Sequence, residues 1–131
     1  MRESDGRSNA LRLGRLCSAT RYSVRGLLAT YRNEAAYRQE LALAALLIPL
    51  ALALAIYSPL TWTQCAMLVG SVLLVLLTEL LNSAIESVVD RISRETHTLS
   101  MRAKDAGSAA VFISLANCIV VWVLVLFDVF G

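Results

Sequence analysis

The chain has 131 residues, 57% of them hydrophobic, with a mean hydropathy of +0.63 and a formal net charge of +2. This composition is too apolar for a soluble domain, and the length excludes several independent domains. We therefore predict that residues 1–131 form one all-α integral membrane domain, with no nucleic acid among its partners.

The first predicted element is an amphipathic helix at about residues 10–32. Its stripe positions recur at three- and four-residue steps, while most of its arginines lie off that stripe. A basic amphipathic helix before a membrane span typically lies in the plane of the membrane interface. Gly14 and Gly26 lower the helix propensity, so a broken helix is an open alternative. The stripe consists of Leu13, Leu16, Thr20, Val24, Leu27 and Tyr31.

Three membrane spans are predicted after this helix, at about residues 38–57, 64–90 and 105–128. A spanning helix needs roughly 20 mostly apolar residues, and these segments meet that requirement together with their flanks. No cleavable signal peptide is expected, because the first forty residues are polar and contain eight arginines.

The placement of charge predicts an orientation in the membrane. All twelve Lys and Arg residues lie before residue 39 or within 91–104, and the connection at 57–64 carries no charge. By the positive-inside rule, the N-terminus and the second connection face the cytoplasm, and the first connection and the C-terminus face the other side. Trp62 and Trp122 suit the aromatic belt at that far interface.

The second span carries a polar stripe towards its C-terminal end. Glu79, Asn82, Ser83, Glu86 and Asp90 follow one another at helical spacing, so they share one helix face. An ionisable side chain at membrane depth costs about 2.5–3.5 kcal/mol on insertion scales and usually faces a partner or a cavity. The alternative is structural: Asn82 and Ser83 hydrogen-bond between helices, and Glu86 pairs with an arginine.

Two carboxylates at different depths suit a reaction between a lipid hydroxyl and a water-soluble anion. Glu79 lies roughly 10 Å deeper than Glu86 at 1.5 Å per residue, where it would accept a proton from an alcohol. Glu86 and Glu34 would hold Mg²⁺ against phosphates, because Mg²⁺ prefers a few carboxylates plus phosphate oxygens. Glu34 has the alternative of an ion pair with Arg38, and the spacing alone leaves both interpretations open.

The second connection supplies candidate phosphate ligands. Lys104 and Arg102 are positioned to bind phosphate oxygens, and the first amides of the third span offer a further anion site. Asp105 is expected to cap that span. His97 is the lone histidine, which as a loop residue is more often an interfacial side chain than a base. The chain contains no Walker A motif, no GxGxxG and no protein-kinase motif.

The strings NEAAYRQE, ELLNSAIESVVDR and ETHTLSMRAKDAGSAAV, in this order and between three spans, resemble the prokaryotic diacylglycerol kinase family, which also contains undecaprenol kinases. The resemblance covers roughly residues 10–128. It implies a homotrimeric inner-membrane enzyme with active sites shared between subunits. Such an enzyme transfers the γ-phosphoryl group of MgATP to diacylglycerol at the cytoplasmic face and yields phosphatidic acid.

The resemblance also implies roles for individual residues. Glu79 matches the catalytic base and Asn82 a residue of the same site, while Glu34 and Glu86 match the metal ligands. The ATP contacts it implies are Arg15, Tyr22, Glu34, Glu86, Glu95, Thr96, His97, Lys104 and Asp105. The lipid-substrate contacts it implies are Arg15, Ser23, Val24, Tyr37, Arg38, Gln39, Glu40, Glu79 and Ser108.

Three positions depart from the family pattern. Val24 stands where close relatives carry Trp, Tyr37 replaces Phe, and Thr96 stands where Tyr is usual before the histidine. Two alternatives to diacylglycerol phosphorylation stay open at this point: an undecaprenol kinase, and a proton- or ion-conducting assembly that uses the polar stripe as a relay. A relay needs acids across the whole membrane, and the far half of every span carries none apart from Asp128 at the very end of the third.

Overall fold

The computed structural model describes residues 3–92 and 98–131, with side chains from residue 14 onward. The described residues form four helices: α1 (Glu3–Asn33), α2 (Ala35–Tyr57), α3 (Trp62–Ile92) and α4 (Thr98–Phe130). Helices α2, α3 and α4 are each long and apolar enough to cross a membrane. The predicted all-α class with three apolar spans is therefore confirmed.

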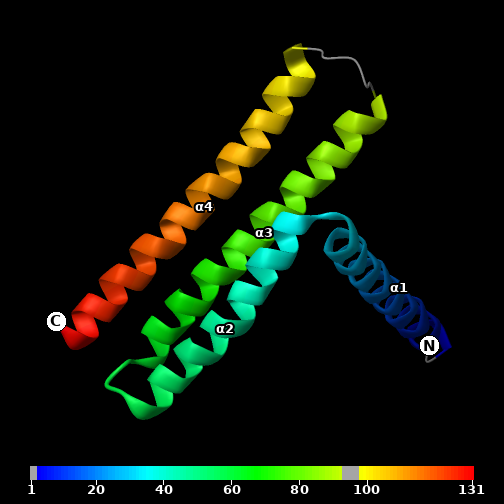
Figure 1. The fold of residues 1–131 in the computed structure, drawn as a ribbon. Helices are drawn as coiled ribbons and strands as arrows, with labels where there is room; N and C mark the ends of the chain where they lie inside the picture. The colour runs from blue at the N-terminus through cyan, green and yellow to red at the C-terminus, as the bar shows by residue number, and fades with distance from the viewer. Residues whose placement is uncertain (1–2, 93–97) are drawn as a thin grey trace. The chain divides into compact units, whose positions relative to one another are not determined.

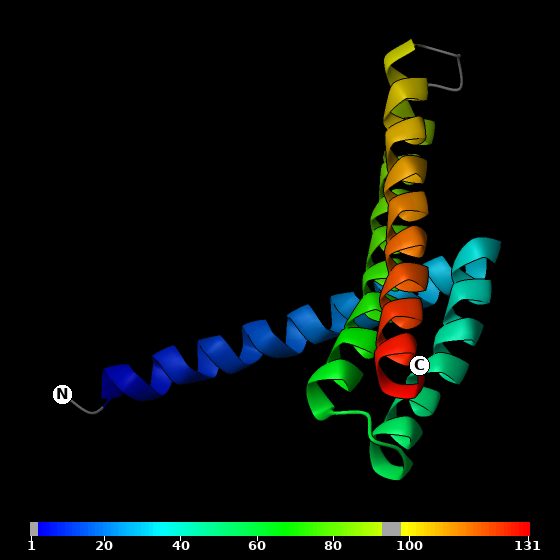
Figure 2. The same cartoon turned by 90° about the vertical axis from the view of Figure 1, so that its left-hand side faces the viewer.

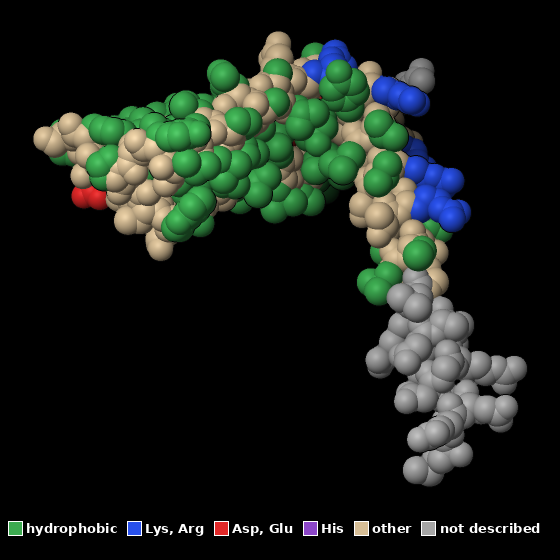
Figure 3. Space-filling model, turned by 90° about the horizontal axis from the view of Figure 1, so that it is seen from below, with side chains coloured by type: hydrophobic (Ala, Val, Ile, Leu, Met, Phe, Trp, Pro, Cys, Tyr) green, Lys and Arg blue, Asp and Glu red, His purple; other side chains and the backbone are tan. Residues whose placement is uncertain are grey.

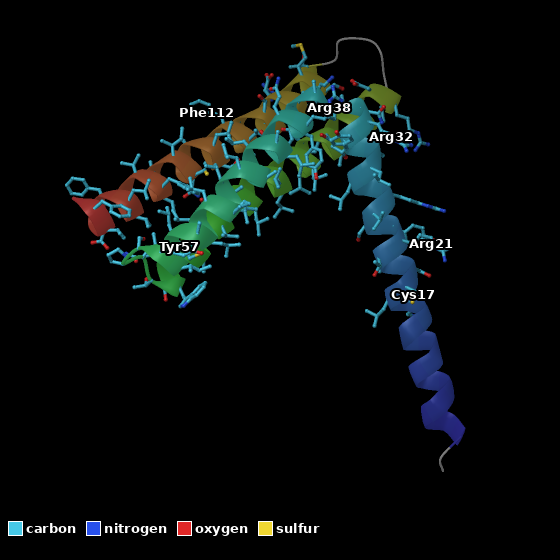
Figure 4. The ribbon with its side chains drawn as sticks, turned by 60° about the horizontal axis from the view of Figure 1, so that its bottom comes forward. Cys17, Arg21, Arg32, Arg38, Tyr57 and Phe112 are labelled. Atoms are coloured by element: carbon cyan, nitrogen blue, oxygen red, sulfur yellow. The ribbon has the colours of Figure 1, made fainter. Side chains whose placement is uncertain are left out.

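The chain divides into two compact units, residues 1–33 and 34–131. Helix α1 belongs to the first unit and is unbroken through Gly14 and Gly26, so the alternative of a broken helix does not hold. Its side chains from residue 14 are nearly all exposed, including large apolar ones such as Tyr22 and Leu16. Arg21 and Arg32, labelled in Figure 4, are among its basic residues.

The second unit is a bundle in which α3 packs against both α2 and α4 (Figures 1 and 2). Short connections make neighbouring helices antiparallel, so the end of α3 and the start of α4 lie at one end, and the shorter α2 begins partway along α3 (Figure 1). At 31 and 33 residues, α3 and α4 exceed the roughly 20 residues that a bilayer requires. Their polar ends therefore extend beyond the hydrocarbon region.

The opposite end, which we call the loop end, is the turn at 58–61 together with the C-terminus. Thr61 and Gln64 form a capping box at the start of α3: the Thr61 amide donates to Gln64 Oε1 at 2.8 Å, and the Gln64 amide donates to Thr61 Oγ1 at 3.2 Å. Gln64 Nε2 also donates to Asp128 Oδ2 at 2.8 Å. The cap thus connects the start of α3 to the end of α4.

The hydrophobic core lies mainly between the loop end and the middle of the bundle. Leu68 and Ala51 are completely buried there. Trp122 is only 9% exposed and packs in this core, so the expectation that it belongs to an interfacial aromatic belt is wrong. Trp62, at 66% exposure, fits that expectation. The core consists of Ala44, Ala51, Leu60, Cys65, Leu68, Val72, Trp122 and Val125.

The outer surface of the bundle is apolar. Figure 3 shows hydrophobic side chains over most of the face of the bundle seen there. Phe112, 73% exposed, extends outward from α4 (Figure 4), and Leu46 of α2 is 65% exposed. A continuous apolar surface of this kind is unfavourable in water but suits a lipid environment. The bundle is therefore the membrane-spanning part of a multi-pass protein.

Candidate active site

A cavity of about 360 Å³ lies beside the start of α2, in the half of the bundle away from the loop end. We call this half of the bundle the cavity end. Residues from all three bundle helices line the cavity, and among the described residues four of these are carboxylates. The lining residues are Glu34, Ala36, Glu40, Glu79, Asn82, Glu86, Ser108, Val111 and Leu115.

Helix α3 supplies the centre of the cavity wall through the predicted polar stripe. Glu79, Asn82 and Glu86 follow at steps of three and four residues, which places them on one face. Glu79 is the deepest of them and only 5% exposed. The two other residues of the predicted stripe do not line the cavity. Ser83 is buried elsewhere, and Asp90 is exposed.

Helix α2 contributes two carboxylates from its first turns. Glu34 is the N-cap residue, with extended backbone angles of −108° and 118° and no side-chain capping hydrogen bond. Its carboxylate is therefore not used to cap α2 and lines the cavity instead. The N-terminal end of a helix carries partial positive charge, which favours an acidic side chain at this position. Glu40 reaches the same cavity from nearly two turns further along α2.

Polar atoms without protein partners are concentrated in this cavity. Within the described part of the chain, Glu40 Oε2 and Asn82 Oδ1 are buried and accept no hydrogen bond. The other amide atom of Asn82, Nδ2, donates to Glu86 Oε1 at 3.2 Å. A buried polar atom without a hydrogen-bond partner lowers the free energy of unfolding by about 1–3 kcal/mol. The two unpaired atoms therefore make this cavity locally unfavourable for stability.

The donor set agrees with Mg²⁺ held jointly by protein and nucleotide. In the described parts of the chain, no group of three or more His, Cys, Asp and Glu side chains is arranged to hold a metal ion on its own. Mg²⁺ in nucleotide sites is typically bound by one or two carboxylates plus substrate phosphates. Glu34 and Glu86, which line the same cavity, fit that smaller requirement.

The lipid-contact residues expected on α2 and α4 take different positions. Ser108 lines the cavity from α4, as Glu40 does from α2. Tyr37 is buried at 4% exposure, whereas Arg38 and Gln39 are exposed on the first turns of α2 and do not line the cavity. Figure 4 shows Arg38 near the start of this helix and Tyr57 at its end.

Four of the expected contacts belong to α1, the separate unit: Arg15, Tyr22, Ser23 and Val24. All four are exposed there. Ser23 Oγ donates to the carbonyl oxygen of Ala19 at 3.1 Å, one turn earlier. A serine that bonds back to its own helix keeps its oxygen lone pairs available for another donor.

The expected nucleotide contacts near the start of α4 lie outside the cavity lining. Lys104 Nζ donates to Asp90 Oδ1 at 2.8 Å in an exposed ion pair that joins α3 and α4. Asp105 does not cap the third span, because α4 begins at Thr98 and Asp105 therefore lies inside the helix. Because α4 begins at Thr98, the first amides of this helix, which were expected to offer an anion site, lie in the turn that starts at Thr98 and not at Asp105. The contacts expected of Glu95, Thr96 and His97 lie outside the described residues.

Sequence reasoning missed the apolar part of the cavity and a glycine behind it. Ala36, Val111 and Leu115 line the cavity without any chemical signature that marks them in the sequence. Gly107, buried in α4, approaches Asn82 closely. A glycine inside a helix is a signal for close packing, and it is present in the string KDAGSA.

Residues 21–126 match the family described as prokaryotic diacylglycerol kinase. A diacylglycerol kinase of Haemophilus influenzae is 49% identical over 115 residues, which cover 88% of this chain and 94% of that protein. The diacylglycerol kinase of Escherichia coli K12 is 43% identical over 124 residues, or 95% and 98% of the two chains. One from Pseudomonas aeruginosa is 46% identical over 114 residues, or 87% and 89%. With most of its length matched in this way, the chain belongs to the prokaryotic diacylglycerol kinase family.

Proposed function

We infer that this chain is a diacylglycerol kinase, a multi-pass membrane enzyme that transfers the γ-phosphoryl group of ATP to the free hydroxyl of diacylglycerol. Membership of the family and relatives named for this activity support the inference. The structural observation that carries it is the cavity, in which carboxylates from α2 and α3 meet inside an apolar bundle. Phosphoryl transfer depends mainly on positioning and charge neutralisation, so a small site of this kind suffices.

Glu79 is the general base in this proposal. Its burial in the cavity wall, further from the C-terminal end of α3 than Glu86, supports this role, since the hydroxyl of an interfacial lipid would have to reach it there. It takes the proton of that hydroxyl as the oxygen attacks the γ-phosphorus, and ADP leaves from the opposite side. Glu40 and Ser108, which line the same cavity, contact the glycerol part of the lipid.

Glu34 and Glu86 hold the Mg²⁺ of MgATP. When bound, the ion neutralises part of the phosphate charge. The chain's own contribution is orientation: Asn82 Nδ2 holds the Glu86 carboxylate at 3.2 Å. The further nucleotide contacts are Arg15, Tyr22, Glu95, Thr96, His97, Lys104 and Asp105, and the further lipid contacts are Ser23, Val24, Tyr37, Arg38 and Gln39.

The cavity end faces the cytoplasm. All Lys and Arg residues lie before residue 39 or within 91–104, which in sequence means before or at the start of α2, or from the end of α3 to the start of α4. The positive-inside rule then puts the cavity at the side where ATP is present, and puts the C-terminus in the periplasm.

The functional unit is a homotrimer with sites shared between subunits. A cavity of about 360 Å³ is near the lower limit for a drug-sized ligand, and a lipid head together with a nucleotide needs more wall than one bundle provides. A mixture of inactive Glu79→Gln and Glu34→Gln chains should therefore regain activity. Complete failure of confirmed mixed oligomers would instead favour sites within one chain.

The experiment that tests the activity is a mixed-micelle assay with MgATP, in which diacylglycerol and undecaprenol are compared as acceptors. We expect phosphatidic acid as the main product. Preferential phosphorylation of undecaprenol would instead identify the chain as an undecaprenol kinase, the other activity in the family that it resembles. Proton flux in proteoliposomes without any lipid phosphate product would overturn the kinase assignment.

A further inference from the structure

Gly107 of α4 stands out from the other described glycines by what surrounds it. It is buried, and a Cβ atom built on it would overlap Oδ1 of Asn82 and lie 3.3 Å from Cγ of the same side chain. The three other helical glycines whose surroundings are described, Gly14, Gly26 and Gly70, would meet no atom within 4 Å. The amide of Asn82 thus packs directly against the bare Cα of Gly107.

The orientation of the Asn82 amide follows from its two neighbours. The Glu86 carboxylate is an acceptor, so the amide must present Nδ2 to it, and the two atoms are 3.2 Å apart. The carbonyl oxygen Oδ1 is then turned towards α4, where it is buried without a hydrogen-bond donor in the described part of the chain. A side chain at position 107 would occupy the space that Oδ1 needs.

Both neighbours of Asn82 on α3, Glu79 and Glu86, line the cavity, whereas Gly107 itself does not. Because Gly107 is not part of the lining but lies against Asn82, which is, we expect its effect on turnover to pass through Asn82. A glycine in a helix interior destabilises the helix relative to alanine, so replacement by alanine would favour the helix if space allowed. The overlap with Oδ1 is the structural reason against alanine at this position.

We propose that Gly107 is a positioning residue for phosphoryl transfer: its missing side chain lets the Asn82 amide lie against α4, and this placement holds the Glu86 carboxylate in the cavity. The inference rests on the proposed function, because it assigns the consequence to Glu86 as a ligand of MgATP. Its geometric part, the dependence of the Asn82 side chain on Gly107, can be measured without any turnover.

The test compares Gly107→Ala with Gly70→Ala, a matched control on α3 where the added methyl group meets no described atom within 4 Å. For Gly107→Ala we expect kcat/KM for MgATP to fall about 10- to 100-fold, which corresponds to losing one hydrogen bond to a charged group. KM for diacylglycerol should change less than twofold. Gly70→Ala should stay within twofold of the wild type in every constant. Equal kinetics of the two variants would overturn the proposal.

A double-mutant cycle separates positioning through Asn82 from a general packing defect. Once Asn82→Ala has removed the overlapping amide, adding Gly107→Ala should cost no further activity. Additive losses would contradict the proposal. If Gly107→Ala alone fails to fold, the double variant should fold because the overlap is gone. Failure of the double variant as well would overturn the steric account.

A spectroscopic measurement keeps this inference distinct from the proposed function. The chain has four asparagines, so protein labelled with ¹⁵N-asparagine gives few side-chain amide signals. The Asn82 signal should shift in Gly107→Ala and stay in place in Gly70→Ala, whatever the substrate is. An unchanged Asn82 signal refutes the packing dependence. An inactive wild type would refute the kinase assignment and with it the catalytic part of this inference, whereas the spectra would still test the packing of Asn82 against Gly107.

Discussion

The two ends of the bundle differ in whether their polar side chains are hydrogen-bonded to one another. At the loop end, Thr61, Gln64 and Asp128 hydrogen-bond to one another and join the start of α3 to the end of α4. At the cavity end, several carboxylates face one space, and buried acceptors of Glu40 and Asn82 have no donor within the described residues. The loop end is arranged for stability, whereas the cavity end keeps unfavourable electrostatics that a reaction can use.

The distribution of the core supports this division. The buried apolar cluster extends from Ala44 through Leu68 to Trp122 and ends before the carboxylates of α3. Trp122 is the exception on its side, because its Nε1 is buried without an acceptor in the part of the chain that the structure describes. The free energy gained by packing the large indole ring can offset the cost of one unpaired N–H group. Burying several carboxylates in one cavity costs more.

The largest expected effect is at Glu79. Glu79→Gln should lower kcat about 10²- to 10⁴-fold with little change in KM for either substrate, because a general base acts mainly in the transition state. Steady-state kinetics with ATP and diacylglycerol each varied provide the measurement. A higher KM for ATP at near-normal kcat would instead assign Glu79 to nucleotide binding.

The next largest effects are expected at the two proposed metal ligands. Glu34→Gln and Glu86→Gln should each raise the Mg²⁺ requirement and KM for MgATP together, because a neutral amide oxygen binds the ion more weakly than a carboxylate does. Titration of activity with Mg²⁺ at fixed ATP measures this. Unchanged Mg²⁺ dependence in both variants would remove them from the metal site.

At the loop end the expected effect is on stability alone. Asp128→Ala removes the acceptor of the 2.8 Å hydrogen bond from Gln64 Nε2, which should lower the free energy of unfolding by about 0.5–1.5 kcal/mol. Asp128→Asn keeps an acceptor oxygen and serves as the matched control. Thermal unfolding in detergent micelles measures both variants. Loss of specific activity in correctly folded Asp128→Ala would show that the two ends are not separate in function.

The smallest effect is expected for the ion pair at the edge of the cavity end. Asp90→Ala should change the free energy of unfolding by about 1 kcal/mol or less, because its partner Lys104 and Asp90 itself are both partly exposed to solvent. Lys104 then becomes free for phosphate, so KM for ATP should stay the same or fall. A severalfold rise in that KM would place Asp90 in the nucleotide site.

The sequence predicted the parts of the molecule that depend on helical spacing and on chain direction. Glu79, Asn82 and Glu86 share a face because of their spacing, and Glu34 joins them because antiparallel helices bring the start of α2 beside the C-terminal half of α3. Glu40 also reaches this cavity, although spacing alone did not assign it there.

Features that depend on the neighbouring helix could not be predicted. Hydropathy gives the depth of Trp122 but not which side of α4 faces the core, so its burial was missed. The apolar run starts next to Asp105, which favours a cap at this residue, yet helix-forming residues extend α4 back to Thr98. The importance of Gly107 becomes visible only once Asn82 lies opposite it.

The central claim is that chemistry and stability reside at opposite ends of one small bundle. The most direct test measures diacylglycerol phosphorylation and thermal unfolding on the same preparations of Glu79→Gln and Asp128→Ala. We predict a crossed result: Glu79→Gln loses activity but unfolds at or above the wild-type temperature, because a buried charge has been removed from a group of acids. Asp128→Ala unfolds at a lower temperature but keeps its activity. Activity that falls in parallel with unfolding temperature in both variants would contradict the account.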